Sequence, residues 1–92
     1  MRVEWSDHAV ADLTAISEFI ERDRSLETAN RVVRTIYDAV QSLTAMPRRG
    51  RLGRVGHTRE LSIPRLPWMV IYRVLEDRLT VLNIVHGARL WP

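Results

Sequence analysis

Arginines that cluster between residues 48 and 65 are the side chains of this chain best suited to binding chemistry. All fourteen basic residues are arginine, and six of them fall in this segment, where Glu60 is the only acid. A guanidinium offers a planar set of N–H donors that matches phosphate or carboxylate oxygens. The segment indicates a surface for phosphates or for an acidic protein; the alternative is a mobile, solvated loop whose charge aids solubility.

The distribution of charge favours the first of these interpretations. Residues 1–27 carry seven acids against three arginines, whereas the whole chain has a net charge of +3. A basic segment that follows an acidic one predicts a polarised surface and a charged macromolecular partner.

A second group of functional side chains lies near the end of the chain, where His86, Arg89 and Trp91 follow the last apolar run. In one interpretation, Trp91 packs on a sheet and His86 forms a local hydrogen bond. In the other, Arg89 is a charged fork and His86 is a donor or proton carrier in a corner that binds phosphate or a partner. The residues alone do not choose between the two.

Several kinds of site are disfavoured. The chain has no cysteine, which excludes disulfides and thiolate-bound zinc, and His8, His57 and His86 lie far apart in the sequence. No serine stands in a Gly-x-Ser-x-Gly turn, and the glycine-rich loop lacks the Lys-Ser/Thr of a phosphate-binding loop. We therefore expect no metal and no cofactor. Without an apolar run of roughly 20 residues or a signal-peptide pattern, we expect a cytoplasmic protein that does not contact the membrane.

Two amphipathic helices are predicted in the first half of the chain. Ser6 is a helix N-cap, and apolar residues then recur every three or four positions through Asp7–Arg22. Ser25 caps a second helix that runs from Leu26 to Ala45, and Pro47 ends it. The short connection between them predicts an antiparallel helical hairpin.

Four strands are predicted, at Arg2–Trp5, Thr58–Ile63, Trp68–Leu75 and Leu79–Val85, while Pro47–His57 is expected to be a loop. The run from Trp68 is apolar at successive positions, which is typical of a strand buried on both faces. It joins the last strand through the short turn at residues 76–78, so this hairpin is expected in the middle of the sheet. The order strand–helix–helix–strand–strand–strand fits a single domain over residues 1–92.

The order of elements and five short strings resemble the RelE/ParE superfamily of toxins from type II toxin–antitoxin (plasmid stabilisation) systems, and the ParE-like branch in particular. The strings are Ala9-x-x-Asp12-Leu13-x-x-Ile16, Pro47-Arg48-Arg49-Gly50-Arg51, Thr58-Arg59-Glu60-Leu61, Val70-Ile71-Tyr72-Arg73-Val74 and Val85-His86-x-x-Arg89-x-Trp91. The resemblance implies an α+β fold in which an antiparallel helical hairpin packs on a twisted antiparallel sheet. It also implies a cognate antitoxin, ParD-like or RelB-like, that binds across the helices and sheet in a hetero-oligomer.

Within this superfamily, RelE-like members cleave messenger RNA on the ribosome and ParE-like members inhibit DNA gyrase. At positions where RelE-like cleavage uses basic residues, this chain has Met69 and, nearby, Glu60 and Ser62. We therefore expect a growth-inhibiting toxin that acts by binding gyrase and is not itself an enzyme. One alternative is a ribosome-dependent mRNA interferase with His86 and Arg89 as candidate catalytic residues, and another is a non-toxic member that only binds its antitoxin.

The expected binding residues form two sets. The antitoxin is expected to contact apolar side chains of the helical hairpin, namely Leu13, Ile16, Ile20 and Tyr37. The target is expected to contact a single basic surface with one aromatic residue, made of Arg48, Arg49, Arg51, Arg54, Arg59, Arg73, Arg89 and Trp91.

Overall fold

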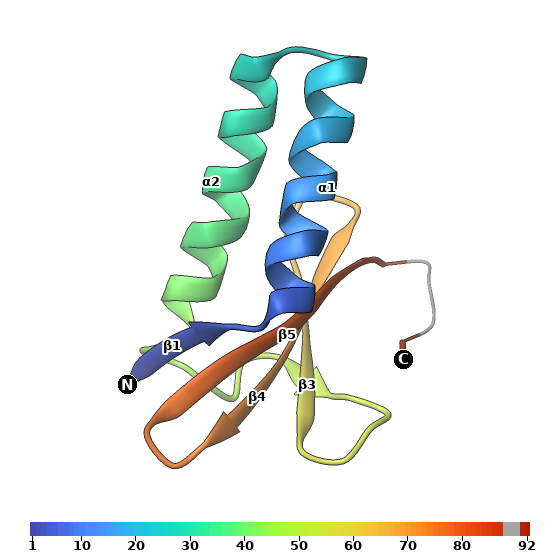
Figure 1. The fold of residues 1–92 in the computed structure, drawn as a ribbon. Helices are drawn as coiled ribbons and strands as arrows, with labels where there is room; N and C mark the ends of the chain where they lie inside the picture. Colours follow the sequence, from blue (N-terminus) through green and yellow to red (C-terminus); the bar gives the residue numbers. More distant parts are fainter. Residues whose placement is uncertain (88–90) are drawn as a thin grey trace.

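The computed structural model describes residues 1–87 and 91–92 of the chain. Two helices, α1 (Asp7–Asp23) and α2 (Leu26–Ser42), form an antiparallel hairpin that covers one face of a twisted five-stranded sheet (Figure 1). The opposite face of the sheet carries no helix among the described residues, and we call it the helix-free face. The α+β class predicted from the sequence is therefore confirmed.

Both helices begin where their caps predict. The Ser6 hydroxyl accepts a hydrogen bond from the backbone N–H of Ala9, and the Ser25 hydroxyl accepts one from Thr28. The second helix ends at Ser42 rather than at Ala45. Its last turn tightens because the Leu43 N–H donates to a carbonyl only three residues back, which stops the helical ladder before Pro47.

The sheet contains β1 (Arg2–Trp5), β2 (Arg51–Leu52), β3 (Thr58–Ser62), β4 (Trp68–Leu75) and β5 (Arg78–His86), in the spatial order β1-β5-β4-β3-β2. The predicted hairpin of β4 and β5 is present, and β4 is the central strand. The sheet is mixed rather than wholly antiparallel, because β1 pairs parallel with β5. Alternation of apolar residues predicts a strand but not its direction, which here depends on the helical hairpin between β1 and β2.

The predicted loop at Pro47–His57 contains the short edge strand β2, which pairs antiparallel with β3. Its two residues carry no apolar alternation that the sequence could have revealed. The pairing places Arg51 opposite Glu60, and the side chains of these two residues form an ion pair across the strands.

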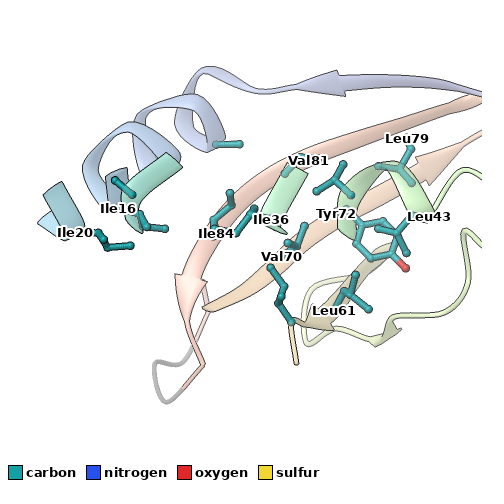
Figure 2. Packing of buried hydrophobic residues seen from close by; sticks show 14 residues of the cluster. Ile16, Ile20, Ile36, Leu43, Leu61, Val70, Tyr72, Leu79, Val81 and Ile84 are labelled. Carbon is teal, nitrogen blue, oxygen red and sulfur yellow. The ribbon is translucent and has the colours of Figure 1, made fainter. Parts of the chain in front are cut away.

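The main core lies between the helices and the sheet. Figure 2 shows its side chains, among them Ile16 and Ile20 from α1, Ile36 from α2, and Tyr72 from β4. A smaller cluster on the helix-free face contains Met69, Ile71 and Val85, with Leu82 and Trp91 packed against it. Neighbouring residues of β4 thus enter opposite clusters, which confirms that this strand is buried on both faces. Each fully buried apolar side chain contributes roughly 1.5–3 kcal/mol to folding.

Within the described part of the chain, no helix is long and apolar enough to cross a bilayer.

Candidate partner-binding surface

The start of the arginine loop (residues 47–57) is fixed to the core by one buried tyrosine. The hydroxyl of Tyr72 donates to the carbonyl of Pro47 at 2.7 Å and accepts from the backbone N–H of Gly50 at 2.9 Å. A Cβ atom at residue 50 would lie 2.7 Å from that hydroxyl, so only glycine fits this close approach. The loop is therefore anchored at residues 47–50, in contrast to the alternative of a mobile loop.

Arg59 forms a second anchor for the same backbone. Its Nη1 donates to the carbonyl of Gly50 at 2.8 Å and to the carbonyl of Arg48 at 3.2 Å. One guanidinium nitrogen thus satisfies two loop carbonyls. The positive charge of Arg59 remains, and its position is fixed by these bonds.

The other predicted target-binding arginines have different environments. Arg49 donates to the hydroxyl of Ser42 at 2.9 Å, and Arg51 Nε lies 2.9 Å from a carboxylate oxygen of Glu60. Arg48 and Arg54 are exposed, and neither side chain has a hydrogen bond or ion pair to another described residue. The predicted surface is therefore a mixture of internally bonded and available cations.

Glu60 has a role that sequence reasoning missed. Its side chain is almost fully buried, yet it carries the carboxylate that binds Arg51 across the β2–β3 pair. The sequence feature that could have predicted this ion pair is that Glu60 is the only acid among the clustered arginines. A buried carboxylate needs such a partner, because an unpaired one is costly to desolvate.

A polar hollow of about 320 Å³ lies at the edge of the sheet beside this loop. Arg48, His57, Thr58 and Arg59 form its polar walls, and the apolar residues Leu52 and Val74 complete it. Among these described lining residues there is no carboxylate. Two arginines and a histidine therefore line a space that suits an anion.

Arg73, on β4, is not among the residues that line this hollow. Its backbone register places it between Thr58 of β3 and Thr80 of β5. Its Nε is buried and has no hydrogen-bond partner among the described residues. Arg73 thus contributes a half-buried charge to the sheet.

The C-terminal corner is held by internal hydrogen bonds. Trp91 Nε1 donates to the side-chain carbonyl of Asn83 at 3.1 Å, and the Asn83 amide donates to Asp12 at 3.0 Å. The same Asp12 oxygen accepts the backbone N–H of Ile84 at 2.9 Å. Trp91 therefore packs on the sheet, as one of the two interpretations of the sequence predicts. Its indole N–H is already used in the hydrogen bond to Asn83.

The two candidate catalytic residues have different outcomes. His86 is exposed at the end of β5, where its backbone pairs with Trp68. Arg89 lies outside the described residues. In the part of the chain that the structure describes, no three histidine or carboxylate side chains gather to hold a metal ion.

The four residues predicted to bind the antitoxin differ in their exposure to solvent. Ile16 and Ile20 are buried at 8% and 6% exposure in the main core, so they are packing residues rather than surface residues. Leu13 and Tyr37 line an open hollow of about 290 Å³ between the two helices, together with Asn30, Val33 and Arg34. The accessible part of the predicted set is therefore Leu13 and Tyr37.

A larger apolar groove of about 760 Å³ lies on the other side of α2. It runs between that helix and the turn at residues 63–66, with Val32, Ala39 and Leu66 among its apolar walls and Arg31 and Arg65 beside them. Sequence reasoning missed this groove, because its walls come from segments about thirty residues apart in the chain.

Comparisons with known proteins agree with this architecture. The family described as the ParE toxin of the type II toxin–antitoxin system parDE matches residues 3–91. Toxin RelE2 of Caulobacter vibrioides is 34% identical over 89 residues, which cover 97% of this chain and 98% of that protein. A Sinorhizobium fredii protein named as toxin Y4kP is 36% identical over 91 residues, which cover 99% of this chain and 93% of that protein.

Solved structures give the same result for the fold. A chain of the chromosomal ParDE toxin–antitoxin system from P. aeruginosa has a TM-score of 0.87 and 28% identity, with 94% of this chain and 95% of that chain covered. A chain of the intact E. coli RelBE toxin–antitoxin complex has a TM-score of 0.71 over 96% of this chain and 98% of that chain. At 10% identity, the second likeness concerns the fold alone.

The fold and these matches define a type II toxin of the RelE/ParE superfamily. Within that superfamily, the chain belongs to the ParE toxin family.

Proposed function

We propose that this chain is a growth-inhibiting toxin of the ParE-like kind, which acts by binding DNA gyrase and is neutralised by a cognate antitoxin. The family match supports a toxin of a toxin–antitoxin pair. Gyrase as the target is what resemblance to the ParE-like branch implies, and it is an argument by analogy. On this proposal, the basic residues bind the target and do not cleave a substrate.

The character of the helix-free face carries the proposal. Cleavage of RNA requires cationic or hydrogen-bonding groups aimed at the phosphate that gains charge in the transition state. On this face, the central strand presents Met69 and Ile71, which are buried with Val85 in an apolar cluster, and Arg73 is the one cationic side chain of that strand. Asn83 and Trp91, the polar groups beside the cluster, bond to each other. This composition favours binding over cleavage.

The surface of the helical hairpin suits the antitoxin. Its hollow has apolar walls in Leu13, Val33 and Tyr37, and the large apolar side chains of Phe19 and Leu26 on the hairpin are 54% and 57% exposed. Exposed apolar surface on a small protein is typical of an interaction site. On our proposal, an apolar face of the antitoxin covers this hollow.

One growth experiment tests the target. The chain is induced in a bacterium with and without the adjacent antitoxin gene, and DNA and protein synthesis are followed separately. We expect early loss of DNA synthesis with defective supercoiling, and recovery when the antitoxin is present. Early loss of translation with cleaved messages would overturn gyrase as the target. Normal growth throughout would favour a member that only binds its antitoxin.

The antitoxin surface is tested by a charge placed in its hollow. Val33→Glu changes a hollow residue that is not packed against the main core, so the fold is expected to remain intact. We expect antitoxin affinity, measured by calorimetry, to fall at least tenfold, because a charge is desolvated at the interface. Thr14→Glu adds the same charge at an exposed α1 position outside the hollow. Equal losses in both variants would remove the hollow from the interface.

A second candidate function is favoured by one similarity. The relative named toxin RelE2 matches nearly the full length of this chain, and RelE-like members of the superfamily cleave messenger RNA. His86 at the end of β5 is then the candidate proton donor. His86→Ala, induced without the antitoxin, separates the two candidates. An mRNA interferase that uses His86 loses toxicity, whereas a gyrase-binding toxin retains it.

A further inference from the structure

The hollow at the sheet edge has the chemistry of an anion site. Three residues with cationic or potentially cationic side chains, Arg48, His57 and Arg59, are among those that line it. Glu60 is the only acid between residues 48 and 65, and its carboxylate is occupied by Arg51 on the β2–β3 pair rather than lining the hollow. The positive charge of the hollow is therefore not neutralised by a lining carboxylate of the described chain.

Part of the site, namely Arg59 and the start of the arginine loop, is held in place before any ligand binds. Arg59 Nη1 is held by two loop carbonyls, and the loop itself is held by the buried Tyr72 hydroxyl. Thr58, a buried wall of the hollow, donates its hydroxyl proton to the Val55 carbonyl at 2.6 Å. A preorganised site loses less conformational entropy on binding than a flexible arginine loop would.

The surroundings favour a polyanion over an isolated anion. Arg49 and Arg54 belong to the same loop, are exposed and have no ion pair to another described residue, so further cations lie close to the hollow along the chain. Leu52, which is 74% exposed, lines the hollow and offers apolar contact beside the charged groups. Phosphates joined by deoxyribose rings, whose C–H groups can contact an apolar side chain, match this combination of charged and apolar groups, whereas an acidic peptide would present carboxylates on flexible side chains.

We infer that the hollow lined by Arg48, His57 and Arg59 binds a backbone phosphate of duplex DNA. This inference rests on the proposed function for its biological setting, since gyrase acts on DNA. Within that proposal the target is gyrase together with its DNA, and the inference assigns the contact made by Arg48, His57 and Arg59 to the DNA. Arg48 is the adjustable contact, because its side chain is exposed and has no hydrogen bond or ion pair to another described residue.

The test measures DNA binding by the purified full chain, without gyrase and without a growth assay. A fluorescently labelled DNA duplex is titrated and its anisotropy recorded at several salt concentrations. We expect Arg48→Ala to weaken binding roughly tenfold, because a charge-assisted contact is lost. The slope of log affinity against log salt should fall by about one for that contact. His57→Asn, which suits the left-handed backbone at φ 66°, should also weaken binding.

The matched control is Arg22→Ala, which removes the same charge from an exposed position at the end of α1. It should leave duplex affinity within about twofold of the original chain, as screening weakens distant charges. Equal weakening by Arg22→Ala and Arg48→Ala would overturn the inference, because it would show a general charge effect without a site. Absence of duplex binding by the unaltered chain would overturn it as well.

Inorganic phosphate distinguishes the source of the ligand. In an NMR titration, we expect phosphate to shift the amide signals of residues 48–59 only at high concentration, whereas the duplex shifts them at much lower concentration. Tight binding of free phosphate with no binding of the duplex would overturn the assignment to DNA. If Arg48→Ala abolishes duplex binding but the chain still inhibits gyrase, the proposed function stands and its dependence on this DNA contact is rejected.

Discussion

The arginine loop and the C-terminal corner both combine cationic, aromatic and hydrogen-bonding residues, yet the fold uses them in opposite ways. In the loop, buried groups hold the backbone while the side chains of Arg48 and Arg54 remain exposed. In the corner, Asp12, Asn83 and Trp91 bond to one another. The comparison shows that similar polar residue types can either remain available at the surface, as Arg48 and Arg54 do, or be occupied by one another, as in the corner.

The corner also has a structural reason for its bonds. The pairing of β1 with β5 ends at Trp5 and Val81, so the edge of β5 beyond that point has no strand beside it. The Ser6 hydroxyl donates to the Leu82 carbonyl at 2.8 Å, and Asp12 accepts the Ile84 N–H. The side chains of Ser6 and Asp12 thus bond to the backbone of β5 where β1 no longer pairs with it, and they satisfy a carbonyl and an N–H that would otherwise lack a partner.

The largest expected effect tests the anchor of the loop. Tyr72→Phe removes the hydroxyl and leaves the Pro47 carbonyl and the Gly50 N–H without that partner. We expect a loss of about 2–3 kcal/mol in the free energy of unfolding, measured with urea. Tyr37→Phe is the control, since that ring is partly exposed and its hydroxyl has no hydrogen bond to another described residue. Similar small losses in both variants would mean that the loop is not anchored by Tyr72.

The next effect tests the corner. Asp12→Ala removes the acceptor shared by Asn83 and Ile84 on a partly buried carboxylate. We expect about 1.5–2 kcal/mol of destabilisation in urea unfolding, because the Ile84 N–H loses its partner. Trp91 fluorescence should change as well, since Asn83 bonds to its indole. Glu18→Ala, at an exposed site on α1, should stay within about 0.5 kcal/mol of the original chain.

The smallest effect separates two arginines of the loop. Arg51→Ala breaks the pair with the buried Glu60, although the arginine side chain itself is 73% exposed. We expect a loss of about 0.5–1 kcal/mol, which decreases in high salt, because water can take the place of the exposed guanidinium and solvate the Glu60 carboxylate. Arg54→Ala should have no measurable effect on thermal unfolding, because that side chain has no hydrogen bond or ion pair to another described residue. A larger loss from Arg54→Ala would contradict the division between bonded and available cations.

Much of the fold was predictable because local signals agreed. The serine caps and the three-to-four-residue spacing of apolar residues predicted both helices, and the apolar run from Trp68 predicted the central strand. The parallel pairing of β1 was not predictable, since four alternating residues contain no information about direction. The short strand β2 was not predicted, because backbone hydrogen bonds and an ion pair hold it in the sheet and its sequence has no apolar alternation.

The candidate site was only partly predictable. The cluster of arginines predicted one basic surface, whereas in the structure Arg73 is not among the residues that line the hollow and Arg51 is paired with Glu60. Ile16 and Ile20 were expected to meet a partner and instead fill the core. An apolar stripe on a helix does not reveal which part faces the sheet and which part remains accessible.

The element order, the helix caps, the buried central strand and the resemblance to a toxin superfamily follow from the amino-acid sequence, because these depend on residues close together in the chain. Which polar groups remain available depends instead on contacts between distant residues of the folded chain. Tyr72 meets the loop at Pro47, twenty-five residues away, and Asp12 meets Asn83 across seventy-one residues. Such contacts carry no local signal, since a hydroxyl or carboxylate has the same chemistry in either setting until the fold supplies its partner.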